Sequence, residues 1–402
     1  HHGAETGRFC ALTSTGRTLI EIREIQVART LKILSIFGTR PEAIKMAPLV
    51  QALKHEPETT ALVCVTGQHR QMLDQVLDFF EIRPDYDLRL MAKNQGLNAL
   101  AGAVLTDLDK VLADVAPDRV LVHGDTTTAM AASLAAFHRR IPVGHVEAGL
   151  RTYRLDQPFP EEMNRRVVDV VSDLLFAPTP RSKFNLRDEQ VEGQITVTGN
   201  TVIDALQATQ ARIAADDALR ARLDAPFAHL DPARRIILVT GHRRESFGEG
   251  FRNMCKALRE LSLRDDVEII YPVHLNPNVQ GPVREALGER DNVHLTAPLD
   301  YLSFQRLLGR SYLVLTDSGG VQEEAPALGK PVLVMREVTE RPEAVDAGTV
   351  LLVGTRPDAI LSAAHHLLDD AAAYESFSGR INPYGDGHAC RRIVDRICGR
   401  RV

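Results

Sequence analysis

The sequence predicts an α/β protein built on two doubly wound, mostly parallel sheets. Short apolar runs alternate with amphipathic helical patterns along most of the chain, which is typical of βαβ units. About a dozen such runs occur, too many for one typical open sheet. The length of 402 residues also fits two or three domains of ~100–200 residues. We therefore expect two lobes, each with its own sheet.

The first lobe is expected from Leu31 onward. Each apolar run there ends in a small or polar turn and is followed by a helical pattern; the run 31–37, for example, leads into a helix at 42–54. The predicted strands of this lobe are 31–37, 62–65, 120–122, 143–146, 174–177 and 195–198.

The second lobe repeats the same alternation. Its predicted strands are 236–240, 267–271, 312–316, 332–335 and 350–353. We place the boundary at Gly199-Asn200, which gives lobes of 31–199 and 200–387. The helical, charged and Ala-rich segment 201–234 leads into the second lobe, whereas the last helical stretch, about 388–402, could pack on either lobe.

Residues 1–30 are expected to be an extension outside the fold. They begin with His1-His2, as the end of a purification tag does, and they contain no apolar segment typical of a secretory signal. We expect this stretch to be disordered.

The composition excludes several classes of protein. A net charge of -5 gives no basic footprint for nucleic acid. No apolar run approaches the ~20 residues that span a membrane. The five cysteines are scattered without a Cys-x-x-Cys pair, which argues against a thiolate metal site or a disulfide framework and fits the reducing cytoplasm.

Cationic residues follow the first predicted strand. Arg40 and Lys45 lie about one turn apart at the start of a helix, with Pro41 at its first position. The backbone N–H groups and the dipole of a helix start favour an anion. A phosphate site and an ordinary solvated helix start both remain open from this pattern.

Acidic residues follow the next strands of the first lobe. Asp125 comes after 120–122 and is either a cleft carboxylate or a helix cap. Glu147 follows 143–146 between small residues and is either a cleft carboxylate or the partner of Arg151. Glu161 and Glu162 open a helix, where acidic residues also suit the dipole.

Further polar residues follow strands of the second lobe. His242 is either a loop residue or a partner for protons and phosphate. Ser318, Gly319 and Gly320 join a strand to a helix, a moderate signal for a nucleotide phosphate. Glu324, one turn further, could accept bonds from both hydroxyls of a ribose or only cap the helix.

Common cofactor motifs are missing from the sequence. The histidines are dispersed, and no Asp-rich loop, phosphate-binding Gly-x-x-x-x-Gly-Lys motif or Gly-x-Gly-x-x-Gly fingerprint occurs. We therefore expect no metal and no cofactor. The carboxylates, cations and helix starts around one cleft suit acid–base chemistry on a nucleotide-linked substrate.

The sequence resembles the non-hydrolysing bacterial UDP-N-acetylglucosamine 2-epimerases from about Leu31 to its end. The resemblance rests on ten segments in order: GTRPEAIKMAP (38–48), HGDTTT (123–128), GHVEAGLR (144–151), PEEMNR (160–165), GNTVID (199–204), GHRRES (241–246), YPVHLN (271–276), DSGGVQEEAP (317–326), TERPE (339–343) and NPYGDG (382–387).

The resemblance implies a glycosyltransferase-B architecture with the active site between two Rossmann-like lobes. It implies reversible conversion of UDP-N-acetylglucosamine to UDP-N-acetylmannosamine without NAD. In this family UDP is eliminated across C1–C2 to leave 2-acetamidoglucal, and then adds back with C2 inverted.

The resemblance also implies roles for individual residues. Asp125, Glu147 and Glu161 are the candidates for proton exchange at C2, without an assignment of which takes the proton. The residues expected to hold the UDP part, apart from these acids, are Arg40, Lys45, His242, Phe304, Ser318, Gly319, Gly320, Glu324 and Arg341, with His242 also counted as catalytic.

Some family members bind a second UDP-N-acetylglucosamine as an activator. Gln68, Gln71, Glu162 and Arg243 match that region, whereas Asn94 stands where an Arg is expected. Homodimers are usual in the family, so we expect UDP-N-acetylglucosamine, UDP and a second copy of the chain as partners.

Three other functions stay open at this stage. They are a UDP-sugar glycosyltransferase of the same architecture, a hydrolysing 2-epimerase and a non-catalytic UDP-sugar sensor. The three carboxylates favour catalysis, because a pure binder of an anion gains nothing from acids nearby.

Overall fold

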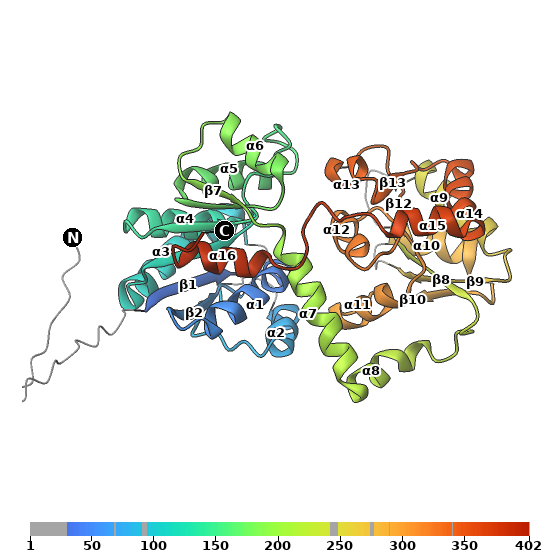
Figure 1. The fold of residues 1–402 in the computed structure, drawn as a ribbon, viewed down its shortest axis with the longest axis horizontal. Coiled ribbons are helices and arrows are strands. Elements are labelled where there is room, and N and C mark those ends of the chain that lie inside the picture. The colour runs from blue at the N-terminus through green and yellow to red at the C-terminus, as the bar shows by residue number, and fades with distance from the viewer. Residues whose placement is uncertain are drawn as a thin grey trace, which may run out of the picture.

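The computed structural model describes residues 30–401 apart from 68–69, 91–94, 242–247, 274–276, 289 and 340. In this part of the chain two parallel sheets form two lobes, side by side and joined by a long helix (Figure 1). The predicted fold class is confirmed. The predicted extension 1–30 lies outside the described residues except for Thr30.

The first lobe holds a seven-stranded parallel sheet in the described residues. Its order is β3 (Tyr86–Asp87), β2 (Thr59–Val65), β1 (Leu31–Phe37), β4 (Arg119–His123), β5 (Val143–Val146), β6 (Leu174–Ala177) and β7 (Gln194–Val197). β1 is buried on both faces, because Ile33 and Phe37 pack in one core cluster and Leu34 and Ile36 in another. Helices therefore cover both faces of this sheet.

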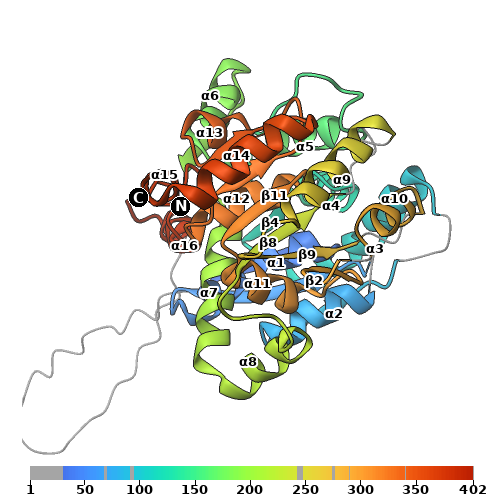
Figure 2. The same ribbon diagram turned by 90° about the vertical axis from the view of Figure 1, so that its right-hand side faces the viewer.

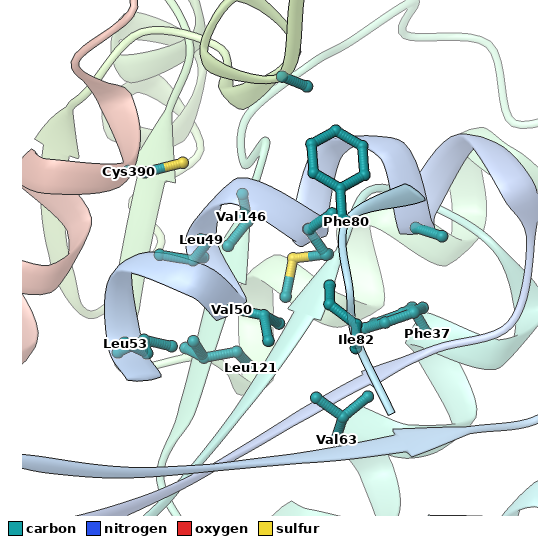
Figure 3. Packing of buried hydrophobic residues seen from close by; sticks show 14 of the residues in the cluster. Phe37, Leu49, Val50, Leu53, Val63, Phe80, Ile82, Leu121, Val146 and Cys390 are labelled. Atoms are coloured by element: carbon teal, nitrogen blue, oxygen red, sulfur yellow. The ribbon is translucent and has the colours of Figure 1, made fainter. Parts of the chain in front are cut away.

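One face carries α1 (Arg40–His55), α2 (Arg70–Phe79) and α16 (Ala389–Ile397). The other carries α3 (Leu97–Val115), α4 (Thr127–His138) and α5 (Glu161–Val171), and α6 (Pro180–Asp188) lies beside β6 and β7. Figure 3 shows Cys390 of α16 pointing toward α1, near Leu49. The last helix therefore belongs to the core of the first lobe.

The second lobe holds a six-stranded parallel sheet in the described residues. Its order is β10 (Val293–Thr296), β9 (Val267–Pro272), β8 (Arg235–Thr240), β11 (Leu313–Thr316), β12 (Val332–Val334) and β13 (Val350–Leu352). The helices of this lobe are α9 (Glu249–Leu261), α10 (Pro277–Leu287), α11 (Tyr301–Arg310), α12 (Gly319–Ala327), α13 (Pro342–Asp346), α14 (Pro357–Asp369) and α15 (Ala371–Ser378). Figure 2 looks onto α9 and α14, which pack together on one face of the second sheet.

The link between the lobes is α7 (Thr201–Ala215), followed by α8 (Asp217–Asp224) and a short 3₁₀ turn, Ala225–Phe227. Val202 and Ile203 pack in a core cluster of the second lobe, whereas Ala205 packs in the core of the first. The segment 201–234 is therefore more than a lead into the second lobe, because α7 is shared by both.

Two strands were missing from the sequence prediction. β3 is only two residues long, and β10 mixes His294 and Thr296 with apolar residues at the edge of its sheet. The other predicted strands agree with the structure within one residue at either end, except that β2 begins at Thr59. In the described residues no helix is long and apolar enough to cross a membrane.

Candidate active site

A cavity of about 460 Å³ lies between the two lobes. The first lobe contributes the turn after β1, and the second contributes the turns after β8 and β11. In both sheets the strand order reverses at these strands, which is where open α/β sheets bind ligands. Seven residues predicted to bind substrate line the cavity: Arg40, Lys45, Phe304, Ser318, Gly320, Glu324 and Arg341.

A second hollow of about 820 Å³ lies between α2, α8 and α11. It shares Arg40, Asp300 and Tyr301 with the first cavity, but Arg40 is the only residue predicted to bind substrate in its described lining, against seven in the first cavity. The smaller cavity is therefore the better candidate for chemistry, although it has half the volume.

The start of α1 is fixed by Glu42, which is buried. Its Oε2 accepts from the N–H groups of Gly38 and Thr39 at 3.0 and 2.7 Å. Its Oε1 accepts from the Thr126 hydroxyl at 2.7 Å, in the turn after β4. Burial raises the pKa of Glu42, and these hydrogen bonds act in the opposite direction. Glu42 therefore ties together the two turns that flank the centre of the first sheet, and so holds Arg40 in place.

Lys45 and Glu147 form a buried ion pair beside the cavity. Glu147 directly follows β5 in a left-handed conformation with φ 71°, and it also accepts from Asn200 Nδ2 at 2.8 Å. Burial opposes ionisation of Glu147, but Lys45, His123 and Arg341 together outweigh it and hold the pKa of this carboxyl well below its usual range. Burial opposes charge on Lys45 too, and the attraction of Glu147 and Glu323 raises the pKa of the amine.

The predicted alternative partner of Glu147 is wrong. Arg151 donates instead to Asp169 Oδ2 and Glu189 Oε2, each at 2.7 Å. These two carboxylates lie on α5 and just after α6. The partner of Glu147 is instead Lys45, which lines the cavity.

Asp125 is held by two consecutive residues of α5. Arg165 donates to Asp125 Oδ2 from Nε at 3.0 Å and from Nη2, and Asn164 Nδ2 donates to the Asp125 carbonyl at 2.9 Å. Asp125 is not the helix cap that the sequence offered as an alternative, because the Thr126 hydroxyl caps α4 by accepting from Ala129 N–H at 3.0 Å.

Glu323 provides a second buried ion pair, this time in the second lobe. Arg341 donates to Glu323 Oε1, and Asn200 Nδ2 donates to Glu323 Oε2 at 2.9 Å. Burial opposes charge on Arg341, but the attraction of Glu323 and Glu147 raises its pKa. Asn200 therefore bridges one carboxylate of each lobe.

Glu324, the next residue of α12, points to a different neighbour. Gln305 Nε2 donates to Glu324 Oε2 at 2.7 Å, so Glu324 is not the helix cap considered above. Burial raises the pKa of Glu324 to about 7, although the bond from Gln305 acts against it. Phe304 lies beside Gln305 on α11 and lines the same cavity. An acid and an aromatic ring thus face one pocket.

The glycine-rich turn after β11 starts α12. Ser318 is the N-cap residue, but its side chain makes no capping bond within the described residues. Ser318 and Gly320 line the cavity, and Gly319 is buried behind them. The N-terminus of α12 therefore faces the cavity, with the orientation that favours an anion.

The two acids at the start of α5 differ in their surroundings. Glu161 is half-buried at the first residue of the helix. Glu162 is fully buried and accepts from the N–H groups of Thr152 and Tyr153 at 3.0 and 3.1 Å, and from Arg165 at 3.2 Å. Glu162 thus holds the loop before α5 in place.

Several predicted residues cannot be placed. Gln68, His242 and Arg243 lie outside the described residues, and so does Asn94. Gln71 is in the first turn of α2, but its side chain is not described. Their predicted roles stay predictions.

The described residues contain one group of three potential metal ligands, Glu56, Glu58 and Cys398. It does not belong to the cavity lining. Arg400 Nη2 lies 2.6 Å from Glu56 and 3.5 Å from Glu58, so a guanidinium already occupies the position of a cation.

Sequence reasoning missed Glu323 and Asn200 as individual residues, although both lie in segments that carry the family resemblance. A signal for Glu323 was present, since it precedes Glu324 in the same turn of helix. A signal for Asn200 was its position at the predicted lobe boundary, where one side chain can contact both lobes. His123, the last residue of β4, was also missed; it is buried, with Nε2 3.8 Å from Glu147 Oε2.

The arrangement suits a doubly charged anion and proton transfer next to it. Three cations line the cavity, Arg40, Lys45 and Arg341, and the last two are each paired with a carboxylate. An incoming anion can attract these two paired cations and thereby change the pKa of the carboxylates. The site can therefore couple binding of an anion to acid–base chemistry.

Known proteins are similar to this chain in sequence. The sequence model of the family described as UDP-N-acetylglucosamine 2-epimerase matches residues 51–398. A UDP-N-acetylglucosamine 2-epimerase of Yersinia pestis is 55% identical over 374 residues, covering 92% of this chain and 100% of that protein.

Solved structures are similar over the same part of the chain. The crystal structure of the UDP-GlcNAc 2-epimerase from Neisseria meningitidis bound to UDP-GlcNAc has a TM-score of 0.83 at 48% identity, covering 92% of this chain and 100% of that one. The enzyme of Methanocaldococcus jannaschii in complex with UDP-GlcNAc and UDP has a TM-score of 0.74 at 32% identity, with coverage of 92% and 100%.

Proposed function

Because this chain belongs to the UDP-N-acetylglucosamine 2-epimerase family, with its glycosyltransferase-B-like pair of lobes, we propose how its cavity performs that reaction. The chain is an isomerase that interconverts UDP-N-acetylglucosamine and UDP-N-acetylmannosamine. The observation that carries the proposal is the contact between a cavity-lining cation, Lys45, and a strand-end carboxylate, Glu147.

The UDP part would occupy the cavity between the lobes. Arg40, Lys45 and Arg341 supply cations for the diphosphate, and the N-terminus of α12 supplies backbone N–H groups. Glu324 would accept from the ribose hydroxyls, and Phe304 would lie against the uracil. His242 would join the diphosphate site as the resemblance implies.

The reaction would proceed by elimination and re-addition of UDP. A base removes the C2 proton, the electron pair forms a C1–C2 double bond, and the C1–O bond breaks to release UDP. The C2 hydrogen is a poor acid because no carbonyl flanks it, so stabilising the departing diphosphate is essential. UDP then adds back to C1 of 2-acetamidoglucal while a proton reaches the other face of C2.

Asp125, Glu147 and Glu161 would exchange these protons. Inversion requires a donor or acceptor on each face of C2. Glu147 follows β5 and Asp125 follows β4, so both come from neighbouring strands of one sheet edge. Glu161 is half-buried on α5, in the helix whose Arg165 holds Asp125.

Incubation with UDP-N-acetylglucosamine alone in D₂O, followed by NMR, tests the proposal. We expect UDP-N-acetylmannosamine with deuterium at C2. Protium at C2 in the product would contradict proton exchange with solvent. Free N-acetylmannosamine with UDP would indicate a hydrolysing epimerase, and turnover only with an added acceptor would indicate a glycosyltransferase.

We also propose a homodimer that works in the cytoplasm. Helices α3, α4 and α5 pack in succession on one face of the first sheet, and each exposes an apolar side chain: Leu97 44%, Phe137 54% and Val170 69% exposed. Pairing of this face with a second copy would cover them. Light scattering should give twice the chain mass, and Val170→Asp should lower it.

A further inference from the structure

His123 is a buried histidine that the mechanism above does not use. It ends β4 next to Val146 of β5, and its side chain is only 5% exposed. Neither ring nitrogen has a hydrogen-bond partner within the described residues. A buried donor is seldom left without a partner, so this imidazole is a candidate for a further interaction in the cleft.

A neighbouring histidine shows the contrast. His145 is fully buried on β5, with Nδ1 2.6 Å from Asp169 Oδ1 and Nε2 2.8 Å from the Gly124 carbonyl. Both ring nitrogens of His145 therefore have a hydrogen-bond partner. Those of His123, on the neighbouring strand β4, have none among the described residues.

The titratable groups around His123 are Glu147, Lys45 and His145. Its Nε2 is 3.8 Å from Glu147 Oε2, just beyond hydrogen-bond distance. Burial lowers the pKa of His123 to about 3, against the attraction of Glu147. The ring is therefore neutral at physiological pH and has a single N–H to donate.

Glu147 has two side-chain hydrogen-bond partners in the described part of the structure. Its carboxylate is held by Lys45 and Asn200, and Lys45 also lines the cavity assigned to the diphosphate. A bound diphosphate competes for the ammonium group, because phosphate oxygens carry more charge than one carboxylate. Glu147 then needs another donor.

We propose that His123 is a positioning residue that donates a hydrogen bond to Glu147 when the diphosphate draws Lys45 away. The proposal rests on the function proposed above. The exchange changes only hydrogen-bond partners: the ring stays neutral, no proton leaves it, and no covalent bond forms or breaks. A neutral donor keeps the carboxylate oriented but favours its charged form less than an ammonium group does. Glu147 can then take or give the C2 proton.

The test compares two substitutions by their kcat–pH profiles. His123→Phe keeps the volume but has no donor, whereas His123→Gln retains an N–H₂ group. We expect the acid limb of kcat to move up by about one pH unit in H123F, because loss of a donor raises the pKa of a carboxylate. H123Q should restore the limb, and KM should stay within about twofold of the original in both. His138→Gln, an exposed change at the end of α4, is the matched control.

A merely structural role would lower kcat in both variants without moving the acid limb, and that result would overturn the proposal. If H123F does not fold, a crystal structure of the unaltered protein with UDP decides: the distance from His123 Nε2 to Glu147 should fall from 3.8 Å to hydrogen-bond range, about 3.2 Å or less. An unchanged distance would also overturn it. Failure of the function itself is seen separately, as absence of deuterated UDP-N-acetylmannosamine from the unaltered protein.

Discussion

The side-chain amide of Asn200 donates a hydrogen bond to Glu147 across the base of the cleft, with 2.8 Å between Nδ2 and Oε2. The same nitrogen lies 2.9 Å from Glu323 Oε2, and the Asn200 Oδ1 caps α7 by accepting from Val202 N–H at 3.1 Å. One residue at the junction of the lobes therefore contacts a carboxylate of each lobe and starts the helix that joins them.

Replacing Asn200 separates its two roles. Asn200→Ser keeps a good cap for α7 but loses both bonds to carboxylates, which we expect to cost about 2 kcal/mol, because bonds to charged groups contribute more than neutral ones. Asn200→Asp also keeps the cap but adds a third carboxylate and should cost more. In urea unfolding at pH 7.5 the midpoint should be highest for the unaltered chain, lower for Asn200→Ser and lowest for Asn200→Asp. Equal midpoints for all three proteins would show that the bonds from Asn200 to the two carboxylates do not stabilise the fold.

The Lys45–Glu147 pair predicts strong coupling in a double-mutant cycle. Lys45→Met leaves a buried carboxylate without its cation, which costs about 3–5 kcal/mol. Glu147→Gln in the same background removes the charge and should recover most of that loss. Additive effects of the two substitutions on unfolding would show that the pair is not coupled.

The same pair predicts a pH window for stability. The pKa of Glu147 is lowered by folding, so its contribution is present above the usual value of 4.5 and is lost as pH falls through the folded value. The pKa of Lys45 is raised, so its contribution is present below 10.5 and is lost as pH rises through its folded value. The stability difference between the unaltered chain and Lys45→Met should therefore be greatest between about pH 5 and 10.

Glu147→Gln should remove turnover but not UDP binding. The amide cannot accept the C2 proton, so we expect kcat to fall by a factor of about 10² or more, as loss of a general acid or base does. UDP affinity by calorimetry should change only a few-fold, since the cations remain. Asp109→Asn, which alters an exposed acid on α3, is the control and should keep full turnover. Near-normal turnover of Glu147→Gln would remove Glu147 from the catalytic set.

Glu324 should make UDP binding weaker at low pH. Its pKa is about 7 in the free cleft, and only the carboxylate accepts from both ribose hydroxyls, so affinity should fall as pH drops below 7. Glu324→Gln should bind UDP weakly and without this pH dependence in calorimetric titrations from pH 5.5 to 8.5. A pH dependence that survives in the variant would assign it to another group.

Glu324→Gln should also stabilise the fold at alkaline pH. Because folding raises the pKa of Glu324 from 4.5 to about 7, stability falls as pH rises between these values and stays lower above them. The half-buried position reduces the effect to about 1–2 kcal/mol. The unfolding midpoint of the variant should therefore exceed that of the unaltered chain at pH 8 and match it at pH 4.

The sequence predicted the fold well because both sheets are buried on both faces. The residues of β1 and β11 are mainly apolar and end at polar turns, so the limits of these strands can be recognised in the sequence. The edge strands β3 and β10 lack that signal. The sequence did not decide the position of α16. Its amphipathic pattern predicts that one face of the helix packs on the protein, but not which lobe that face contacts.

The candidate site was predicted where its residues end strands or start helices. Lys45 and Glu147 were found in this way, but their contact was not, because it joins α1 to the turn after β5 over 102 positions. In the sequence Glu323 looks like an ordinary helix residue and Asn200 like an ordinary helix cap. Their role comes from the approach of the two lobes, which no local pattern encodes.

The place of α16 has a consequence for biosynthesis. Ile393 and Ile397 of α16 complete the apolar core of the first lobe, whose first strand begins at Leu31. All strands of the second sheet lie between that strand and α16 in the sequence. During synthesis, the first lobe therefore cannot complete its core until α16 has been made. The second lobe, whose strands all precede α16, can therefore fold before the first, although the first begins to be synthesised earlier.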